Sequence, residues 1–253
     1  MIRLVFALLF VFVSSLPASA QRLVSMASRD QVAITSSFSG ETLTFFGNIE
    51  PEAGAEQRFV EGPFHVVITV TGPWQNRVAR HSEPVFGVWM TTEQSLFRSF
   101  PSYYHVLSSG TLADITSAET LHELRILPED QVQLAAEPGD RRATDLGAEM
   151  LRLMAERGLV ATNQTGVVFR SETFYAAQVS LPADVPPGSY LAHTYLFKNG
   201  ALIAERSEGF TVRKIGFERF LGQAASNQPL LYGLATVLLA LFTGWLGGVV
   251  FRR

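Results

Sequence analysis

The last 25 residues constrain the fold of this chain more than any other stretch. The segment Pro229 to Phe251 contains 23 residues and no charged side chain, and Arg252 and Arg253 follow it. At a rise of about 1.5 Å per residue, a helix of this length spans about 34 Å, which exceeds the roughly 30 Å hydrocarbon core of a bilayer. The sequence therefore predicts a transmembrane helix at 229–251, and the rest of the chain is interpreted as a protein held at a membrane surface.

The first 20 residues have the organisation of a secretory signal peptide. Arg3 precedes the apolar run Leu4 to Val13, and Ala18-Ser19-Ala20 supplies the small residues that precede a cleavage site. We expect cleavage after Ala20, with an uncleaved signal anchor as the alternative. A translocated N-terminus and a basic C-terminal pair follow the positive-inside rule, which predicts an external domain and a cytoplasmic tail at 252–253.

Composition excludes several classes of function. Between residues 21 and 228, 23 acidic side chains outnumber 17 basic ones, and this net charge of −6 argues against binding to nucleic acid or tight docking on anionic lipid. The chain contains no cysteine, which excludes disulfides, thiol nucleophiles and cysteine metal sites.

Short apolar segments punctuated by proline and glycine indicate a mainly β domain at 21–213. This spacing of strands and turns is typical of an immunoglobulin-like β-sandwich. Asn199-Gly200 is the strongest local signal, because this dipeptide favours a two-residue type I′ hairpin turn. The predicted strands are 31–38, 42–49, 64–71, 77–81, 85–91, 101–108, 166–170, 173–181, 190–198 and 202–213, with 85–91 expected to be buried.

The hydrophobic period changes in the middle of the chain. Residues 117–126 have a possible N-cap at Ser117, and 144–157 place apolar residues at helical spacing before Gly158, a good helix-terminating residue. We therefore predict a helical insertion at about 111–160. Glu129-Asp130, beside Pro128, is interpreted as a solvated loop.

Two features adjoin or lie within the predicted span. Residues 214–228 include phenylalanines that can share one helical face, which suggests an amphipathic juxtamembrane segment; a plain linker is the alternative. Gly244 and Gly248 form a GxxxG pattern inside the span. Small residues at this spacing allow another helix to approach closely, so these two glycines are candidate helix-packing residues.

The best candidate for a binding surface is an aromatic stretch at 88–105. We interpret it as two strand-like segments joined by a loop that carries Arg98. Aromatic side chains with polar tips can form a partner or ligand surface, and the candidates are Trp89, Phe97, Tyr103 and Tyr104. The alternative is that these residues belong to the sandwich core.

No catalytic or cofactor motif is visible, so no catalytic residue, metal ligand or cofactor is predicted. The histidines are scattered and show no metal-ligand spacing. An envelope enzyme or metal-binding domain assembled from His65, His81, His105 or His193 remains the alternative function.

Three segments, which together span almost the whole mature chain, resemble the Alph_Pro_TM family of single-span membrane proteins from alphaproteobacteria. They are VAITSSFSGETLTFFG, GVWMTTEQSLFRSFPSYYHVLSS, and the ending from VRKIGFERF to VVFRR. The resemblance implies an inner-membrane protein with a periplasmic domain and no transferable catalytic residues. It also suggests a non-enzymatic accessory or binding role beside a permease similar to sulfite or sulfonate exporters. A structural protein of the cell envelope is a further alternative.

Overall fold

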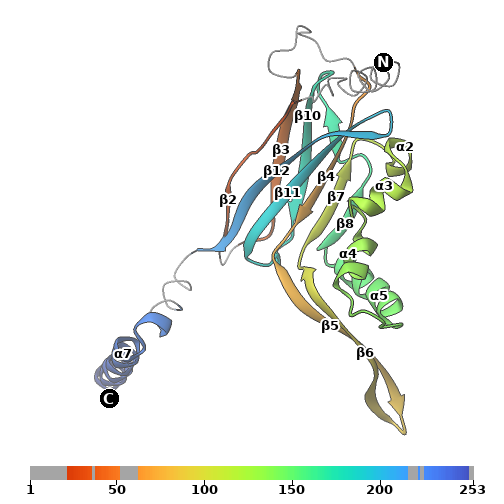
Figure 1. Ribbon diagram of the computed structural model, residues 1–253. Coiled ribbons are helices and arrows are strands. Elements are labelled where there is room, and N and C mark those ends of the chain that lie inside the picture. Colours follow the sequence, from red (N-terminus) through yellow and green to blue (C-terminus); the bar gives the residue numbers. More distant parts are fainter. Residues whose placement is uncertain (1–21, 36–37, 52–61, 216–221, 223–224, 251–253) are drawn as a thin grey trace, which may run out of the picture.

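The computed structural model describes residues 22–35, 38–51, 62–215, 222 and 225–250 (Figure 1). The predicted signal peptide, much of the juxtamembrane segment and the basic tail lie outside these residues. The described part is mainly β, with a group of helices in the middle of the chain and one long apolar helix near its end. The prediction of a mainly β protein with one C-terminal apolar helix is confirmed.

The strands include one at 22–27 and one at 160–163 that the sequence analysis did not predict. The strands are β1 (Arg22–Ala27), β2 (Gln31–Ile34), β3 (Glu41–Glu50), β4 (His65–Thr71), β5 (Trp74–Val85), β6 (Val88–Pro101), β7 (Tyr104–Ser108), β8 (Val160–Asn163), β9 (Val167–Phe169), β10 (Phe174–Leu181), β11 (Gly188–Lys198) and β12 (Ala201–Lys214). The helices are α2 (Leu112–Ile115), α3 (Ala118–Glu123), α4 (Pro128–Ala135), α5 (Ala143–Glu156) and α7 (Pro229–Val250).

Two sheets enclose the core. One has the strand order β1-β3-β10-β9 and the other β2-β12-β11-β4-β7-β8. Side chains from both sheets meet between them, as in the contact of Phe45 with Phe210 at 5.9 Å between ring centroids. The Tyr103 hydroxyl, just before β7, donates a hydrogen bond to the Ser180 carbonyl at 2.9 Å and so joins the start of β7 to β10.

The strand orders support the immunoglobulin-like interpretation without settling it. The two sheets of an immunoglobulin domain have the strand orders A-B-E-D and G-F-C. If the letters A to G are given in chain order to β1, β3, β4, β9, β10, β11 and β12, the first sheet has the order A-B-E-D, and β12, β11 and β4 have the order G-F-C. β2 pairs in parallel with β12, and a further parallel pair, β7 with β8, extends the second sheet beyond this pattern. The immunoglobulin-like assignment stays a prediction.

The central helices lie within the predicted insertion. The Ser117 side chain accepts a hydrogen bond from the Thr120 amide and caps α3, and α5 ends before Gly158, whose φ is +68°. The interpretation of residues 129–130 as a solvated loop was wrong. Pro128 begins α4, where a missing amide hydrogen costs nothing, and Asp130 in the first turn is buried.

The largest difference between the structure and the prediction is the β5–β6 hairpin. Instead of a short strand at 77–81 and a buried strand at 85–91, two strands of 12 and 14 residues pair with each other and project from the sandwich (Figure 1). They turn at Phe86-Gly87, and the segment predicted to be buried forms the exposed far end. Arg98, expected in a loop, lies within β6.

Candidate functional site: the projecting hairpin and the apolar helix

The four aromatic candidates do not form one surface. Phe97, Tyr103 and Tyr104 are buried in the core, whereas Trp89 is 72% exposed near the far end of β6. The core alternative therefore describes the first three residues. Their burial follows from the register of β6 and β7 against neighbouring elements, which the aromatic composition alone does not reveal.

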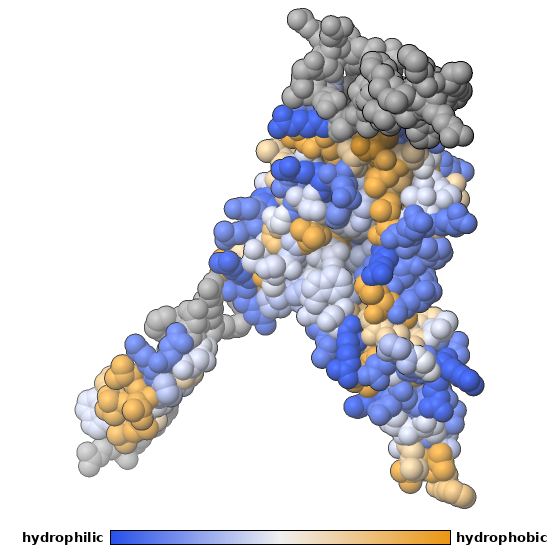
Figure 2. Space-filling model, in the orientation of Figure 1, coloured by the Kyte–Doolittle hydropathy of each residue, from blue (hydrophilic) through white to orange (hydrophobic). Residues whose placement is uncertain are grey.

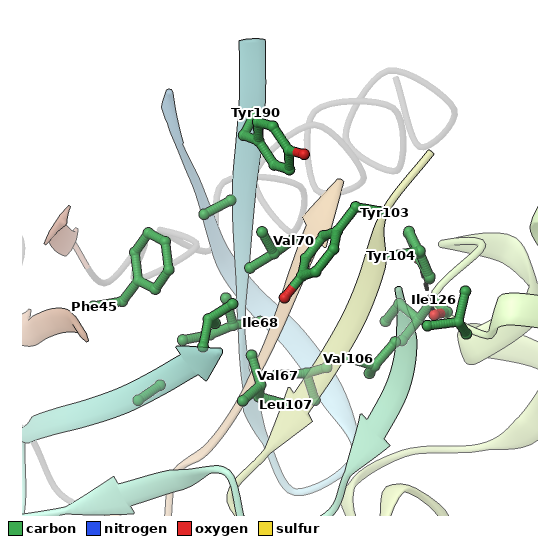
Figure 3. Packing of buried hydrophobic residues seen from close by; sticks show 14 of the residues in the cluster. Phe45, Val67, Ile68, Val70, Tyr103, Tyr104, Val106, Leu107, Ile126 and Tyr190 are labelled. Carbon is green, nitrogen blue, oxygen red and sulfur yellow. Dashed lines mark hydrogen bonds between the residues drawn. The ribbon is translucent and has the colours of Figure 1, made fainter. Parts of the chain in front are cut away.

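The two buried tyrosines have internal hydrogen-bond partners. The Tyr104 hydroxyl donates to the carbonyls of Arg125 and Ile126 at 3.1 and 3.0 Å (Figure 3). Burial is the main cause that raises the pKa of Tyr103 and of Tyr104 above the ordinary value for tyrosine. Both phenols stay neutral at physiological pH and serve the packing of the domain.

The helical insertion supports the base of the hairpin. Phe97 is fully buried and forms an isolated β-bridge with Ala136, just after α4. On the exposed side, Arg142 lies 3.2 Å from Glu93 in an ion pair, and Arg98 lies 2.8 Å from Glu137 in a second. The inner half of the hairpin is therefore held against α4 and α5.

Beyond this support, the hairpin end is apolar and exposed. Phe86, Val88, Trp89 and Met90 are exposed to 102%, 63%, 72% and 53%. Figure 2 shows the orange colour of hydrophobic residues at the far end of the hairpin, beyond more hydrophilic side chains. We define residues 84–92 as the hairpin tip. The sequence pattern indicates Trp89 but not Phe86, because the exposure of Phe86 depends on a tight turn that phenylalanine does not usually form.

Three of the four histidines of the alternative function, His81, His105 and His193, have separate local partners. His81 Nε2 lies 3.2 Å from Glu83, and His193 Nε2 lies 3.3 Å from Glu205. His105 Nε2 donates to the Gly158 carbonyl at 3.0 Å, and its ring stacks on Tyr103 at 4.2 Å between centroids. Among the described residues, no group of three histidine, aspartate or glutamate side chains is placed to hold a metal ion.

A cavity of about 630 Å³ lies beside α4, and one histidine–aspartate pair lines it. His122 Nδ1 is 2.6 Å from Asp130 Oδ1, while Asp130 Oδ2 accepts a hydrogen bond from the Leu127 amide at 3.2 Å. Asp130 thus caps the start of α4, which accounts for its burial. The contacts of the pair are those of a helix cap.

The last helix, α7, has the length and composition of a membrane span. Residues Pro229–Val249 form a window with mean hydropathy 1.8, and none of it is buried inside the structure. A Cβ atom added at Gly244 or at Gly248 would meet no atom within 4 Å. Both glycines therefore leave open space beside the helix backbone, and their predicted role in helix packing stays a prediction.

Comparison with known proteins identifies a family. A family described as "Putative transmembrane protein (Alph_Pro_TM)" matches residues 22–253, and no curated protein matches the chain.

Two solved structures have low similarity to this chain. A chain from a structure that describes T cell specificity and activation by the bacterial superantigen toxic shock syndrome toxin-1 is 8% identical over 77% of this chain and 100% of that one, with a TM-score of 0.26. The alkylpurine DNA glycosylase AlkC of Pseudomonas fluorescens, bound to DNA containing an abasic site analogue, is 9% identical over 77% of this chain and 31% of that one, with a TM-score of 0.22. Neither score supports an argument, whereas the family match extends from β1 to the last residue, so the chain belongs to the Alph_Pro_TM family of transmembrane proteins.

Proposed function

We propose that this protein is a membrane-anchored accessory or binding protein of the bacterial inner membrane, with its β domain in the periplasm and its C-terminus in the cytoplasm. The observation that carries the proposal is α7, an apolar helix with no buried part, which follows the last strand of the domain after a short connection. Exposed apolar surface of this extent is unfavourable in water and favourable in a bilayer. The basic pair at 252–253 favours the proposed orientation.

A binding role accounts for the domain better than catalysis. His81, His105, His122 and His193 are engaged in local contacts, and among the described residues of the domain the apolar hairpin tip is a large exposed feature that the packing of the domain does not require. Apolar patches exposed in this way commonly mark contacts with proteins or membranes.

The proposed partner is a polytopic membrane protein, in the simplest case a permease similar to sulfite or sulfonate exporters. Gly244 and Gly248 lie one turn apart on the same face of α7, with open space beside both. A partner helix could approach the backbone closely there, which is how small residues favour helix association in membranes.

Co-purification tests this proposal. The full chain is cross-linked in cells, extracted in mild detergent and compared with Gly244→Leu/Gly248→Leu. Ala235→Leu is the matched control, because at about 100° per residue it lies on the opposite face of α7 from Gly244. We expect a polytopic protein that copurifies with wild type and with the control and is lost from the double variant. Recovery of no specific membrane partner with the wild type would contradict the accessory role.

A further inference from the structure

We propose that the hairpin tip inserts into the interface of the same bilayer that α7 crosses, so that the domain contacts the membrane at two separate points. This inference rests on the proposed function only through the assignment of α7 as the membrane span. It concerns the hairpin tip and not the glycine face of α7, and it assigns the tip to the zone where lipid acyl chains meet their headgroups.

The composition of the tip fits that zone. Residues 84–92 form nine consecutive positions without a charged side chain, bounded by Glu83 and Glu93. The most exposed of them are the aromatic residues Phe86 and Trp89. Tryptophan is enriched where membranes meet water, because its ring is apolar and its N–H can bond to polar groups.

The turn at the tip uses an unfavourable residue. Phe86 and Gly87 have φ values of +50° and +82° and close a two-residue loop between Val85 and Val88. Asn199 and Gly200 close the β11–β12 hairpin with almost the same values, +50° and +84°. Asparagine tolerates this left-handed conformation, whereas phenylalanine does so at a cost. The Phe86 side chain is fully exposed, so contacts within the domain do not compensate for that cost.

The hairpin emerges from the end of the sandwich at which the chain leaves for α7. Gly188 at the start of β11 pairs with Val212 near the end of β12, while Leu191 pairs with Thr71 at the end of β4. A Cβ atom on Gly188 would lie 2.8 Å from Pro73, the residue before β5. The base of the hairpin and the exit from β12 are therefore neighbours, and Figure 1 shows the tip and α7 on the same side of the sandwich.

The dimensions allow both contacts together. From Trp74 to Val85, at about 3.3 Å per residue, β5 extends about 36 Å from its base. The connection from Lys214 to Pro229 can span at most about 50 Å, whatever its conformation. The span can thus begin at the same membrane surface that the tip reaches. Because α7 already holds the domain there, insertion of the tip is an intramolecular step and requires little affinity of its own.

The hairpin geometry also limits how deep the tip can go. Apart from the bridge of Phe97 with Ala136 near the base, β5 and β6 pair with each other among the described residues, so their outer edges at the tip retain unpaired backbone groups that cannot enter the hydrocarbon core. An interfacial depth of about 5–10 Å satisfies this limit and still buries the apolar side chains. The acidic residues at the two ends of the tip indicate that binding depends on apolar contact and not on anionic headgroups.

The positions of three tryptophans provide the test. Trp74 lies at the base of the hairpin, Trp89 at its tip and Trp245 in α7. Three single-tryptophan versions of the full chain, made by Trp→Phe substitution at the other two positions, are placed in lipid nanodiscs of phosphatidylcholine at one protein per disc. Their fluorescence is compared with that in discs whose acyl chains carry bromine near the headgroup.

We expect bromine to reduce the emission of the Trp89 version at least about twofold, as for the Trp245 version, and to leave the Trp74 version close to unchanged. If Trp245 is quenched and Trp89 behaves like Trp74, the lipid contact is wrong while the span stands. Loss of quenching at Trp245 would instead contradict the span on which the proposed function rests. Quenching of Trp89 that requires two or more copies per disc would overturn the inference in favour of contact between tips.

Discussion

Phe86 and Asn199 occupy the same backbone conformation in two different hairpins, each with φ +50° and each followed by a glycine. One position carries the residue that suits a tight turn, and the other carries a large aromatic residue that extends into solvent. This difference suggests that the β5–β6 turn is adapted for a contact outside the domain and not for stability.

Replacing Phe86 by asparagine should therefore stabilise the domain by about 1 kcal/mol, because asparagine adopts the left-handed conformation more readily. The measurement is urea unfolding of the full chain in detergent. Asn199→Phe is the reciprocal control and should destabilise by a similar amount. If Phe86→Asn leaves the free energy of unfolding unchanged or lowers it, the turn does not carry the cost that we assign to it.

Stability measurements should distinguish the buried residues of the aromatic stretch at 88–105 from the exposed ones. Phe97→Ala should lower the free energy of unfolding by about 3–5 kcal/mol, because it removes a fully buried ring and leaves a cavity. Trp89→Ala should change it by no more than about 0.5 kcal/mol, because its side chain is exposed. Equal losses from the two substitutions would contradict the described division between core and tip.

The support of the hairpin by the helices depends on close contact at Gly147. A Cβ atom at this position of α5 would lie 2.2 Å from a Val132 methyl group and 3.4 Å from the Phe97 ring. Gly147→Ala should therefore cost about 1–3 kcal/mol of stability through overpacking. Gly139→Ala is a poor control because its φ is +86°, so Gly110→Ala, with open space around its Cβ, is preferred. A neutral effect of Gly147→Ala would show that α5 does not press on the hairpin.

Acid should weaken the domain through His105. Burial is the main cause that lowers the pKa of His105 below its ordinary value, against the opposing effect of the hydrogen bond to Gly158. The unfolded chain therefore binds the proton more readily, and the stability from neutral His105 is present above about pH 6.5 and is lost as the pH falls through the folded-state pKa.

The expected slope over this window is at most about 1.4 kcal/mol per pH unit for one proton. Urea unfolding of the full chain at a series of pH values measures it, and His105→Gln, which keeps a hydrogen-bond donor, should flatten this part of the profile. An unchanged slope in His105→Gln would assign the acid sensitivity to other groups.

Local chemistry explains which elements could be predicted from the sequence. The Asn199-Gly200 turn, the Ser117 cap and the end of α5 before Gly158 each depend on one or two residues with a specific backbone role. The apolar tip was predicted to be a buried strand, because an apolar segment that contacts something outside the chain has the same composition as one inside the core.

The location of the aromatic residues could not be predicted for a different reason. Burial of Phe97 and Tyr104 depends on α4 and on the segment before it, and the pairing of β4 with β7 and β11 joins segments that are distant in sequence. Alternation along one strand does not show which neighbour covers which face. Of the four candidate aromatic residues only Trp89 is exposed, and the structure adds Phe86 to the candidate site.

We propose that α7 places the β domain and the C-terminus on opposite faces of the inner membrane. Because the chain has no cysteine, a single introduced thiol reports its own location. Glu119→Cys, exposed on α3, and a cysteine added after Arg253 are compared in spheroplasts with a membrane-impermeant maleimide. We expect labelling of Glu119→Cys in intact spheroplasts and labelling of the C-terminal cysteine only after lysis. Labelling of the C-terminal cysteine in intact spheroplasts would contradict it.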